Sequence, residues 1–334
     1  MNHTLKRAGG LALPGFATHL EGACVCGVRN RTDRGGRCGY RCRKRASAGC
    51  VSVRLGPVRM PMTEATFSSA LQLVGLWIYP IKSCAGIQVS SARVFPQSGL
   101  AGDREWVIIN RENHQVWMGE LHRMALVQPR LEGGSMVLQA SGFSALTVPG
   151  QLPGKPCQVE IWNDDEKVNE TFSGQDAGDE ASEWLTAVLG QPLRLVRLGQ
   201  DGLTRKALMP LHVLSLASFR QLNQRLAAQG HAPVEYERFR PNLVVDDAEL
   251  APFVEEGFSS LRWSEGAPEI QFSGHCIRCI MPNISPKDAT ADREPLAAVA
   301  ALSRERQQKN PIFGVYGRVL SEGVLTVGLR GQAR

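Results

Sequence analysis

Short runs of apolar residues dominate the chain from about residue 71 onward. Gly, Pro, Asn and Asp separate these runs, which is typical of strands joined by turns. In the first half, strands are predicted at residues 73–79, 87–95, 106–109, 115–118, 136–139 and 158–162, with a hairpin turn at 110–113. In the second half, they are predicted at 193–198, 242–245, 270–272, 313–319 and 324–327, with a polar link at 199–204.

Three segments instead repeat apolar residues at helical spacing. They cover residues 180–189, 216–226 and 294–307. Asp179 is placed to cap the first helix, and Gly190 to end it. Ser215 is placed as the N-cap of the second helix, and Pro295 is tolerated in the first turn of the third.

Many short strands with few helices between them argue against a doubly wound sheet. The pattern predicts an α+β, β-rich fold with a barrel-like body and a soft domain boundary near residue 190. The chain contains no uninterrupted apolar run of the ~18 residues that a membrane span needs. We therefore expect a soluble protein.

Residues 1–62 differ from the rest in charge, because they carry 12 of the 38 Lys and Arg residues but only two acids. The remainder has 26 basic and 30 acidic residues, a formal charge of −4. A nucleic-acid binder would carry its basic charge on the folded domain, so that function is excluded.

Three interpretations of residues 1–65 stay open. The segment lacks periodicity, which favours an unstructured leader or an over-extended start, with translation beginning at Met60 or Met62. It is also Arg-rich and acid-poor, as targeting peptides are, but it has little Ser. The spacings of Cys24 and Cys26 and of Cys38 and Cys42 suggest zinc, although no His follows at finger spacing.

Outside this segment the chain has four cysteines, at positions 84, 157, 276 and 279. Scattered thiols in a chain of this length fit a reducing compartment better than a disulfide scaffold. Cys276 and Cys279 form a Cys-x-x-Cys pair, which can be a redox dithiol, half of a zinc site, one metal-ligating thiolate with a neighbour, or two buried thiols. Pro282 makes an uninterrupted helix after the pair improbable on steric grounds, which argues against a thioredoxin-type dithiol.

Two segments place cations at turns beside strands. Lys82 and Ser83 follow an apolar strand that Pro80 interrupts, and Arg104 follows a glycine-rich turn. Glycines permit close approach of the backbone to a ligand, and the cations can bind an anion such as phosphate. A solvated lysine and an Asp103–Arg104 turn pair are the structural alternatives.

A further cation, Arg240, precedes Pro241 and is therefore expected in an extended backbone that fixes its direction. A structural salt bridge is the alternative role for this arginine. Asn242 opens an apolar strand, where its amide can bind a ligand or cap the turn.

These segments occur in an order that resembles MOSC proteins, in particular those with an N-terminal MOSC β-barrel domain followed by the MOSC domain. The pattern consists of residues 79–83, 102–104 and 238–242 and the Cys276–Cys279 pair. The resemblance covers about residues 70–330. It includes the mitochondrial amidoxime reducing component with its bacterial counterparts, and the carboxy-terminal part of molybdenum cofactor sulfurase. It implies domains at residues 70–190 and 191–334.

The resemblance also implies a molybdenum cofactor (Mo-molybdopterin). Cys276 matches the position that ligates the metal. The positions matching cofactor contacts are Lys82, Ser83, Arg104, Ser215, Ser218, Arg240 and Asn242.

The implied function is a molybdenum-dependent reductase, an oxidoreductase that cleaves the N–O bond of a small N-hydroxylated compound. Because the sequence shows no flavin, haem or iron–sulfur signature, its electrons are expected from a separate donor, which is cytochrome b5-like, ferredoxin-like or a flavin reductase. The expected location is cytoplasmic, or mitochondrial if residues 1–60 are a transit peptide. A non-catalytic carrier of the cofactor or of sulfur, and a zinc-bound interaction domain, are the alternatives.

Overall fold

The computed structural model describes residues 71–334, apart from residues 153, 207–208 and 265. The three interpretations of residues 1–65 lie outside these described residues. In the part of the chain that the structure describes, no helix is long and apolar enough to cross a membrane.

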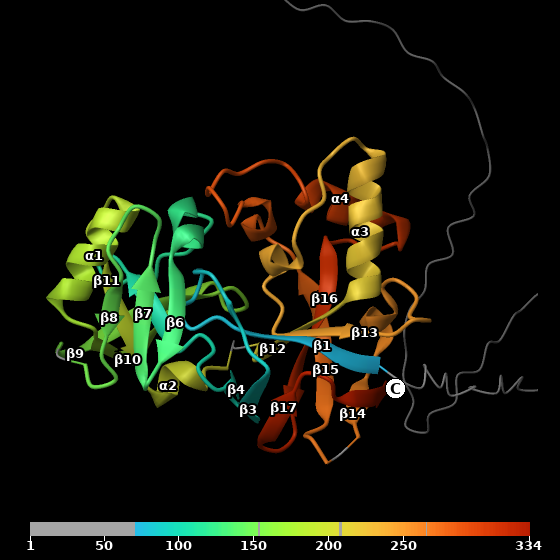
Figure 1. The fold of residues 1–334 in the computed structure, drawn as a ribbon, viewed down its shortest axis with the longest axis horizontal. Coiled ribbons are helices and arrows are strands. Elements are labelled where there is room, and N and C mark those ends of the chain that lie inside the picture. The colour runs from blue at the N-terminus through green and yellow to red at the C-terminus, as the bar shows by residue number, and fades with distance from the viewer. Residues whose placement is uncertain (1–70, 153, 207–208, 265) are drawn as a thin grey trace, which may run out of the picture. The chain divides into compact units, whose positions relative to one another are not determined.

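Seven strands close into a barrel, which is the larger of the two bodies drawn in Figure 1. The barrel closes because β13 pairs with both β12 and β1, in parallel and antiparallel fashion respectively. Closure leaves no unpaired edge among these strands. In their order around it, the barrel strands are β13 (Leu243–Asp246), β12 (Leu211–Ser215), β16 (Ile312–Val319), β15 (Ile270–Ile277), β14 (Ser260–Trp263), β18 (Arg330–Ala333) and β1 (Leu71–Ile78).

Strand β1 shows how the apolar pattern gives the barrel its core. Leu71 and Leu73 are buried, as are Leu76 and Ile78, so the alternation of inward positions shifts by one residue in mid-strand. The shift is a bulge near Gly75 in the register with β13. A Cβ at position 75 would lie 3.2 Å from the side chain of Val244, so the absence of a side chain lets the two strands approach.

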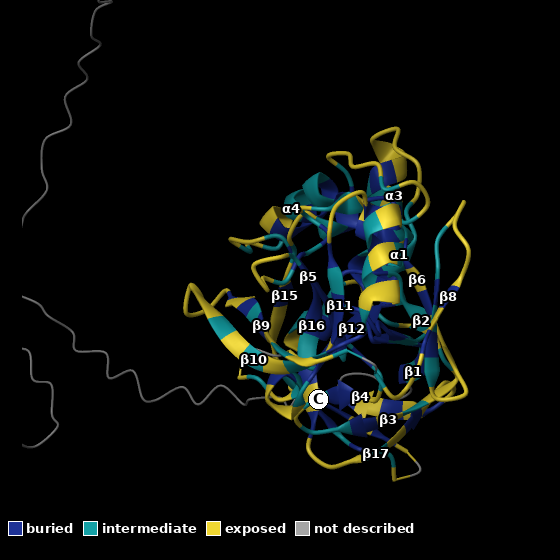
Figure 2. Cartoon of the chain, turned by 90° about the vertical axis from the view of Figure 1, so that its left-hand side faces the viewer, coloured by how far each residue is buried: buried dark blue, intermediate teal, exposed yellow. Residues whose placement is uncertain are grey.

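A second, smaller body contains two further sheets, which together with helix α1 (Asp179–Leu189) enclose their own apolar core. One sheet is β5 (Trp106–Ile109), β11 (Arg194–Leu198), β10 (Val168–Asp176) and β9 (Pro156–Asn163). The other is β6 (Gln128–Glu132), β7 (Ser135–Gln139) and β8 (Leu146–Val148), and short helix η1 (His122–Leu126) precedes it. In Figure 2 strands β5 and β11 are mostly buried, whereas much of β9 and β10 and the outer face of α1 are exposed or half-buried.

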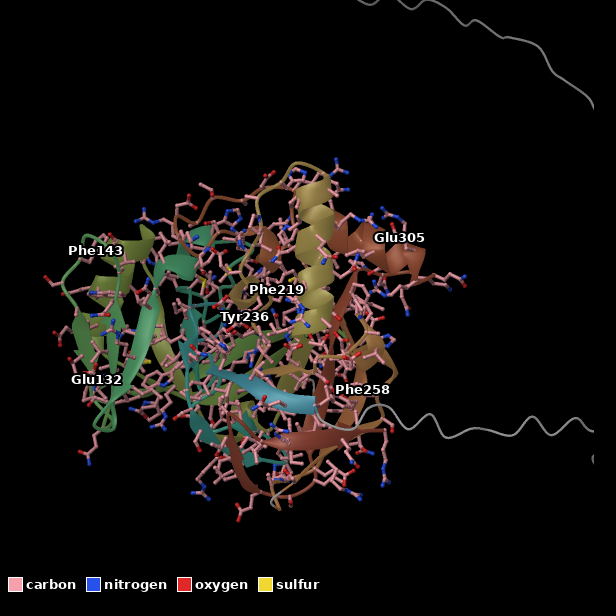
Figure 3. All side chains as sticks on the ribbon, turned by 45° about the vertical axis from the view of Figure 1, so that its right-hand side comes forward. Glu132, Phe143, Phe219, Tyr236, Phe258 and Glu305 are labelled. Carbon is pink, nitrogen blue, oxygen red and sulfur yellow. The ribbon has the colours of Figure 1, made fainter. Side chains whose placement is uncertain are left out.

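The remaining elements pack around the barrel. Helices α3 (Leu216–Ala228) and α4 (Leu296–Glu305) cover one end through an aromatic cluster, in which Phe219 and Tyr236 meet edge to face, as labelled in Figure 3. A small sheet joins β17 (Gly323–Thr326), β3 (Ser91–Phe95) and β4 (Gly99–Leu100). The short elements are β2 (Ile87–Gln88), α2 (Gln200–Leu203), η2 (Tyr236–Phe239), η3 (Val254–Gly257) and η4 (Met281–Asn283).

The predicted β-rich α+β fold with a barrel is confirmed. The capping role of Ser215 is also confirmed, since its hydroxyl accepts a hydrogen bond from the backbone N–H of Ser218 at 3.1 Å. Gly190 ends α1 in the left-handed conformation, as expected. The domain limits at residues 70–190 and 191–334 remain predictions. The barrel itself takes β1 from the first of these ranges and its other strands from the second.

Several local predictions were wrong. Residues 87–95 form two strands rather than one, and residues 115–118 contribute only a bridge at Gln115. The link at 199–204 contains the short helix α2, because its backbone N–H groups find carbonyls one turn back. Gly178, not Asp179, is the N-cap of α1. Strand β15 continues well past Phe272 to Ile277, because β16 offers it a long partner.

Candidate functional site

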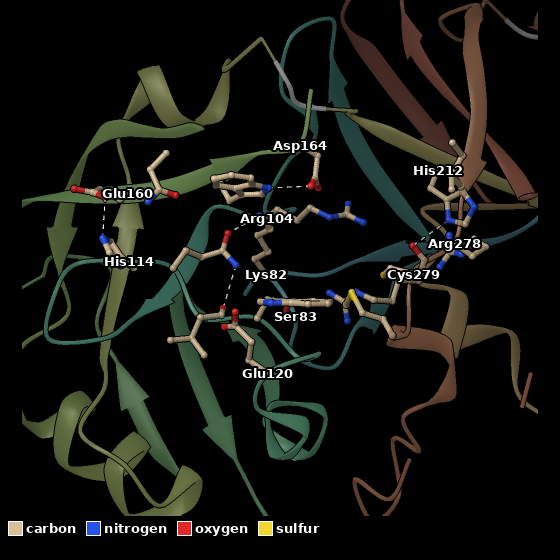
Figure 4. A pocket seen from close by; sticks show the side chains of 18 of the residues that line it. Lys82, Ser83, Arg104, His114, Glu120, Glu160, Asp164, His212, Arg278 and Cys279 are labelled. Carbon is tan, nitrogen blue, oxygen red and sulfur yellow. Dashed lines mark hydrogen bonds and ion pairs between the residues drawn. The ribbon is translucent and has the colours of Figure 1, made fainter. Parts of the chain in front are cut away.

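Residues of the barrel and of the second body line a cavity of about 870 Å³, shown in Figure 4. Four cations line it: Lys82, Arg104, Arg240 and Arg278. We call these four residues the cationic wall. Four positively charged groups around one cavity favour an anionic ligand.

The turn after β1 positions the first cation. The backbone N–H of Lys82 donates to the carbonyl of Trp106 at 2.8 Å, which ties the turn to β5. Its Nζ donates to Oε1 of Gln115. Burial, then Arg205 and Arg104, lower the pKa of Lys82 to about 7. The solvated-lysine alternative therefore does not describe this side chain.

Arg104 lies at the centre of a network around Tyr79. Its Nη1 donates to Oδ1 of Asn242 at 3.1 Å, and its guanidinium lies 5.3 Å from the centre of the Tyr79 ring. It also forms an ion pair with Asp103, whose Oδ1 accepts the backbone N–H of Tyr79 at 2.7 Å. The Asp103–Arg104 turn pair therefore exists, and it holds Arg104 at the cavity.

The extended backbone expected for Arg240 was wrong. Its φ of 55° and ψ of 49° are left-handed, because the residue ends η2 and its N–H returns to the carbonyl of Glu237 at 2.9 Å. The guanidinium lies 4.1 Å from the centre of the Tyr79 ring and donates through Nη1 to the carbonyl of Cys84. Burial, with a further contribution from Arg104, lowers the pKa of Arg240 to about 10. None of the ion pairs among the described residues includes Arg240.

Three of the predicted site residues share an uncommon backbone conformation. Ser83, Arg104 and Arg240 have φ values of 70°, 53° and 55°. For residues other than glycine, left-handed backbone costs on the order of 1 kcal/mol or more and collects at functional sites. The fold holds these three residues in place against that cost, and all three line the cavity.

Cys276 lies on β15 and contacts Arg278, one of the four residues of the cationic wall. Its thiol is buried, and Nη1 of Arg278 donates to its Sγ at 2.7 Å. Nη2 of Arg278 donates to the carbonyl of Phe239 at 2.9 Å. Arg278 lines the cavity, so it connects the thiol to the cavity.

The surroundings of Cys276 favour its thiolate. Burial raises the pKa of the thiol, but the charges of Arg278 and His212 and hydrogen bonds from His212 and Tyr316 outweigh burial. The pKa is therefore held well below its usual range. Cys276 and Cys279 are both free thiols, and Cys279 is exposed at the cavity.

Sequence reasoning missed His212, Arg278 and Tyr316. Arg278 was the easiest to find, because it stands between the two cysteines of the pair. His212 and Tyr316 lie on neighbouring strands β12 and β16 and face each other as a register pair. No local motif marks them, since only strand pairing brings them to Cys276.

Cys276 itself and the remaining predicted residues, Asn242, Ser215 and Ser218, are not among those that line the cavity. Asn242 is buried and supports the wall: its Oδ1 accepts from Arg104 and from the N–H of His212, and its Nδ2 donates to the carbonyl of Trp77 at 3.2 Å. Ser215 and Ser218 both donate to the buried carboxylate of Glu255, at 3.1 and 2.6 Å. Cofactor contacts by these three residues remain predictions.

The residues of the site fit an anionic cofactor that carries a soft metal. Nη2 of Arg240 and Nε of Arg278 are buried without a hydrogen-bond partner among the described residues, so they can donate to a ligand. No three His, Cys, Asp or Glu side chains gather in a metal-binding group within the described part of the chain. A thiolate is a soft ligand, so Cys276 could hold a metal whose other ligands come from its cofactor.

Comparisons with known proteins identify the family of the chain. Residues 70–192 match the MOSC N-terminal beta barrel domain, and residues 203–330 match the MOSC domain. The chain is 30% identical over 320 residues to mitochondrial amidoxime reducing component 2 of Rattus norvegicus, covering 85% of this chain and 90% of that protein. It is 28% identical over 320 residues to mitochondrial amidoxime-reducing component 1 of Homo sapiens, with the same two coverages. Molybdenum cofactor sulfurase of Danio rerio is 30% identical over 311 residues, which are 81% of this chain but only 36% of that protein.

Proposed function

The chain belongs to the MOSC family, and from that premise we propose that it is a molybdenum-cofactor-dependent oxidoreductase that reduces N-hydroxylated compounds. The observation that carries the proposal is the hydrogen bond between the Cys276 thiol and Arg278, a residue that lines the cavity. Relatives named for amidoxime reduction and for molybdenum cofactor sulfuration support it.

In this proposal the residues have separate tasks toward the cofactor. Cys276 supplies a thiolate ligand to the metal. Lys82, Arg104 and Arg240 would bind the phosphate and pterin, because all three line the cavity and Nη2 of Arg240 has no hydrogen-bond partner among the described residues. Four neighbouring residues complete the proposed set of contacts: Ser83, Ser215, Ser218 and Asn242.

When bound, the cofactor would supply the two electrons that cleave the N–O bond. With two protons, the products are the reduced nitrogen base and water. In the cofactor-free protein, Lys82 can hold or release a proton at Nζ near neutrality, because its pKa there lies at about 7. Arg278 holds Cys276 in place through its Nη1, and its Nη2 is fixed by the carbonyl of Phe239.

The electrons are proposed to come from a separate redox protein, which is cytochrome b5-like, ferredoxin-like or a flavin reductase. We propose that the protein works in the cytoplasm. Because the relatives are named as mitochondrial, a reporter fused to residues 1–62 tests the other location. An organellar signal from that fusion would replace the cytoplasmic proposal.

The experiment that tests the function is metal analysis combined with turnover. The full chain, purified from cells that make the cofactor, is expected to contain molybdenum in near-stoichiometric amount. With an electron donor, it is expected to reduce benzamidoxime to benzamidine. Molybdenum without turnover would favour the carrier function, and zinc in place of molybdenum would refute cofactor binding altogether.

A further inference from the structure

The cavity has a second wall whose chemistry is opposite to that of the cationic wall. It consists of Trp117, Glu120, Glu160, Trp162 and Asp164, all from the second body and its loops. We call these five residues the aromatic–acidic wall. Figure 4 shows Glu160 on one side of the cavity and Arg278 and Cys279 on the other, with Lys82 and Arg104 between them.

Trp162 is held at the cavity with much of its indole in solvent. The residue is 51% exposed, although large aromatic side chains are usually mostly buried. Its Nε1 donates to Oδ1 of Asp164 at 3.0 Å, which fixes the ring to the turn between β9 and β10. Buried Asn163 builds that turn, because its Oδ1 accepts the N–H groups of Asp165 and Glu166 at 2.9 and 3.2 Å. The turn therefore holds the indole at the cavity, where it can contact a ligand.

Trp117 is positioned by a glycine. A Cβ at position 119 would lie 2.2 Å from the Trp117 ring, so the indole folds back over the backbone of Gly119. The N–H of Glu120 donates to the carbonyl of Trp117 at 3.0 Å, and this turn places the two side chains on the same wall. Any side chain at position 119 would therefore displace the ring.

The carboxylates of this wall are not equivalent. Glu160 forms an ion pair with His114 at 2.9 Å, and Asp164 accepts from Trp162. The carboxylate of Glu120 forms no ion pair or hydrogen bond with any of the described residues. Glu120 is therefore the acid that is available to a ligand.

A wall of indoles and a carboxylate recognises flat, positively charged groups. A cation over an indole gains from the negative face of the ring, and an ion pair with Glu120 adds to it. An anion would be repelled by this wall and attracted to the cationic wall. The lining of the cavity therefore contains groups that suit an anion and groups that suit a flat cation.

We propose that Glu120, Trp162 and Trp117 determine specificity for N-hydroxylated substrates whose flat body carries a separate positive charge, such as N-hydroxylated aromatic compounds that also bear an amidinium or guanidinium group. The proposal rests on the proposed function, since it assigns the substrate-binding side of the same cavity. The cationic wall would take the anionic cofactor, which leaves the aromatic–acidic wall to the substrate.

The experiment measures binding without turnover, by calorimetric titration of the full chain, loaded with cofactor or as purified. The probes are benzamidine, a flat cation at pH 7, and benzamide, its neutral analogue of the same shape. Benzamidine is expected to bind more tightly than benzamide by about two- to fivefold, the effect of one partly exposed ion pair. Glu120→Gln is expected to abolish that difference while leaving benzamide binding unchanged.

Two more variants distinguish the contribution of the Trp162 indole to binding from that of the Glu120 carboxylate. Glu132→Gln is the matched control, because Glu132 is exposed on the β6–β7 hairpin and does not line the cavity. Trp162→Leu is expected to weaken both probes, because it removes the indole face that both would cover. The proposal is overturned if benzamide binds as tightly as benzamidine, or if Glu120→Gln behaves like Glu132→Gln. Because no turnover is needed, failure to reduce benzamidoxime would refute the proposed function and leave this result standing.

Discussion

Replacing Lys82 by Met is expected to stabilise the cofactor-free protein at low pH and to weaken its binding of anions. Both effects follow from one property, the burial of the ammonium group beside Arg205 and Arg104, which lowers its pKa from 10.5 to about 7. A lowered pKa means that the folded state resists the charge that the unfolded state accepts freely. In the ligand-free protein the buried charge of Lys82 is therefore unfavourable. When an anion is bound, the same charge stabilises the complex.

The size of the effect follows from the shift. At 1.36 kcal/mol per unit, the shift in the pKa of Lys82 corresponds to on the order of 4–5 kcal/mol. This is an upper value, because the lysine is not fully buried and water screens part of the cost. If Lys82→Met recovers half of this free energy, its melting temperature should rise by roughly 4–8 °C in a domain of this size.

The pH dependence has a definite sign. Below pH 7 the lysine is charged in the folded and in the unfolded protein, so the folded protein is destabilised by the full free energy of burying the charge. Between about pH 7 and 10.5 only the unfolded state keeps the proton, so the stability of the native protein rises with pH. The advantage of Lys82→Met over the native chain is therefore greatest at pH 6 and is lost as the pH approaches 10.5.

The assay is thermal unfolding at pH 6 and pH 9, with and without sulfate, whose charge does not change over this range. At pH 6, sulfate is expected to bind Lys82→Met roughly 10- to 150-fold more weakly than it binds the native chain, because one charge-assisted contact is lost. It should also bind the native chain more weakly at pH 9 than at pH 6. Lys206→Met is the control, since that side chain is 90% exposed. A Lys82→Met protein that melts below the native chain at pH 6, or sulfate binding independent of pH, would refute the reasoning.

Three further outcomes are expected. Cys276→Ser should lose molybdenum and reductase activity but keep its fold, because a hydroxyl is a poor ligand for a soft metal. Cys279→Ser should retain most of its molybdenum and most of its activity. Metal analysis measures the molybdenum and circular dichroism the fold, and full activity of Cys276→Ser would exclude the thiol as ligand. Asn242→Leu should lose about 1–3 kcal/mol of stability in urea unfolding, because it leaves buried backbone groups on two strands unpaired. A chain that begins at Met62 should keep the melting temperature and molybdenum content of the full chain, and a loss of either would show that residues 1–61 contribute to the fold.

Much of the secondary structure could be predicted from local patterns. Residues 106–109 match β5 because four consecutive apolar residues stand between polar turns. The predicted helix at 216–226 and its cap at Ser215 follow from apolar spacing and a hydroxyl at the right position. The misassigned segments, such as 115–118, depend on whether a partner strand is present, and local sequence does not carry that information.

The candidate site divides in the same way. The sequence by itself determined which chemical groups are available: a thiol in a Cys-x-x-Cys pair, cations at turns, and a proline that stops a helix. It also determined their order along the chain, on which the family resemblance depends. It did not determine that Lys82 is buried or that Arg240 is left-handed, because both depend on neighbours far away in the sequence.

Tertiary structure decided which of these groups meet. Closure of the barrel pairs β1 with β13, so the N–H of Trp77 donates to the carbonyl of Asn242 at 2.8 Å. The hydroxyl of Tyr79 reaches the carbonyl of Pro241 at 3.1 Å, across 162 positions in the sequence. Arg104 and Arg240 can then both lie over the Tyr79 ring. Because such contacts depend on strand pairing and on the burial of charge, no local window of sequence contains them, and only the folded chain brings the four cations to one cavity.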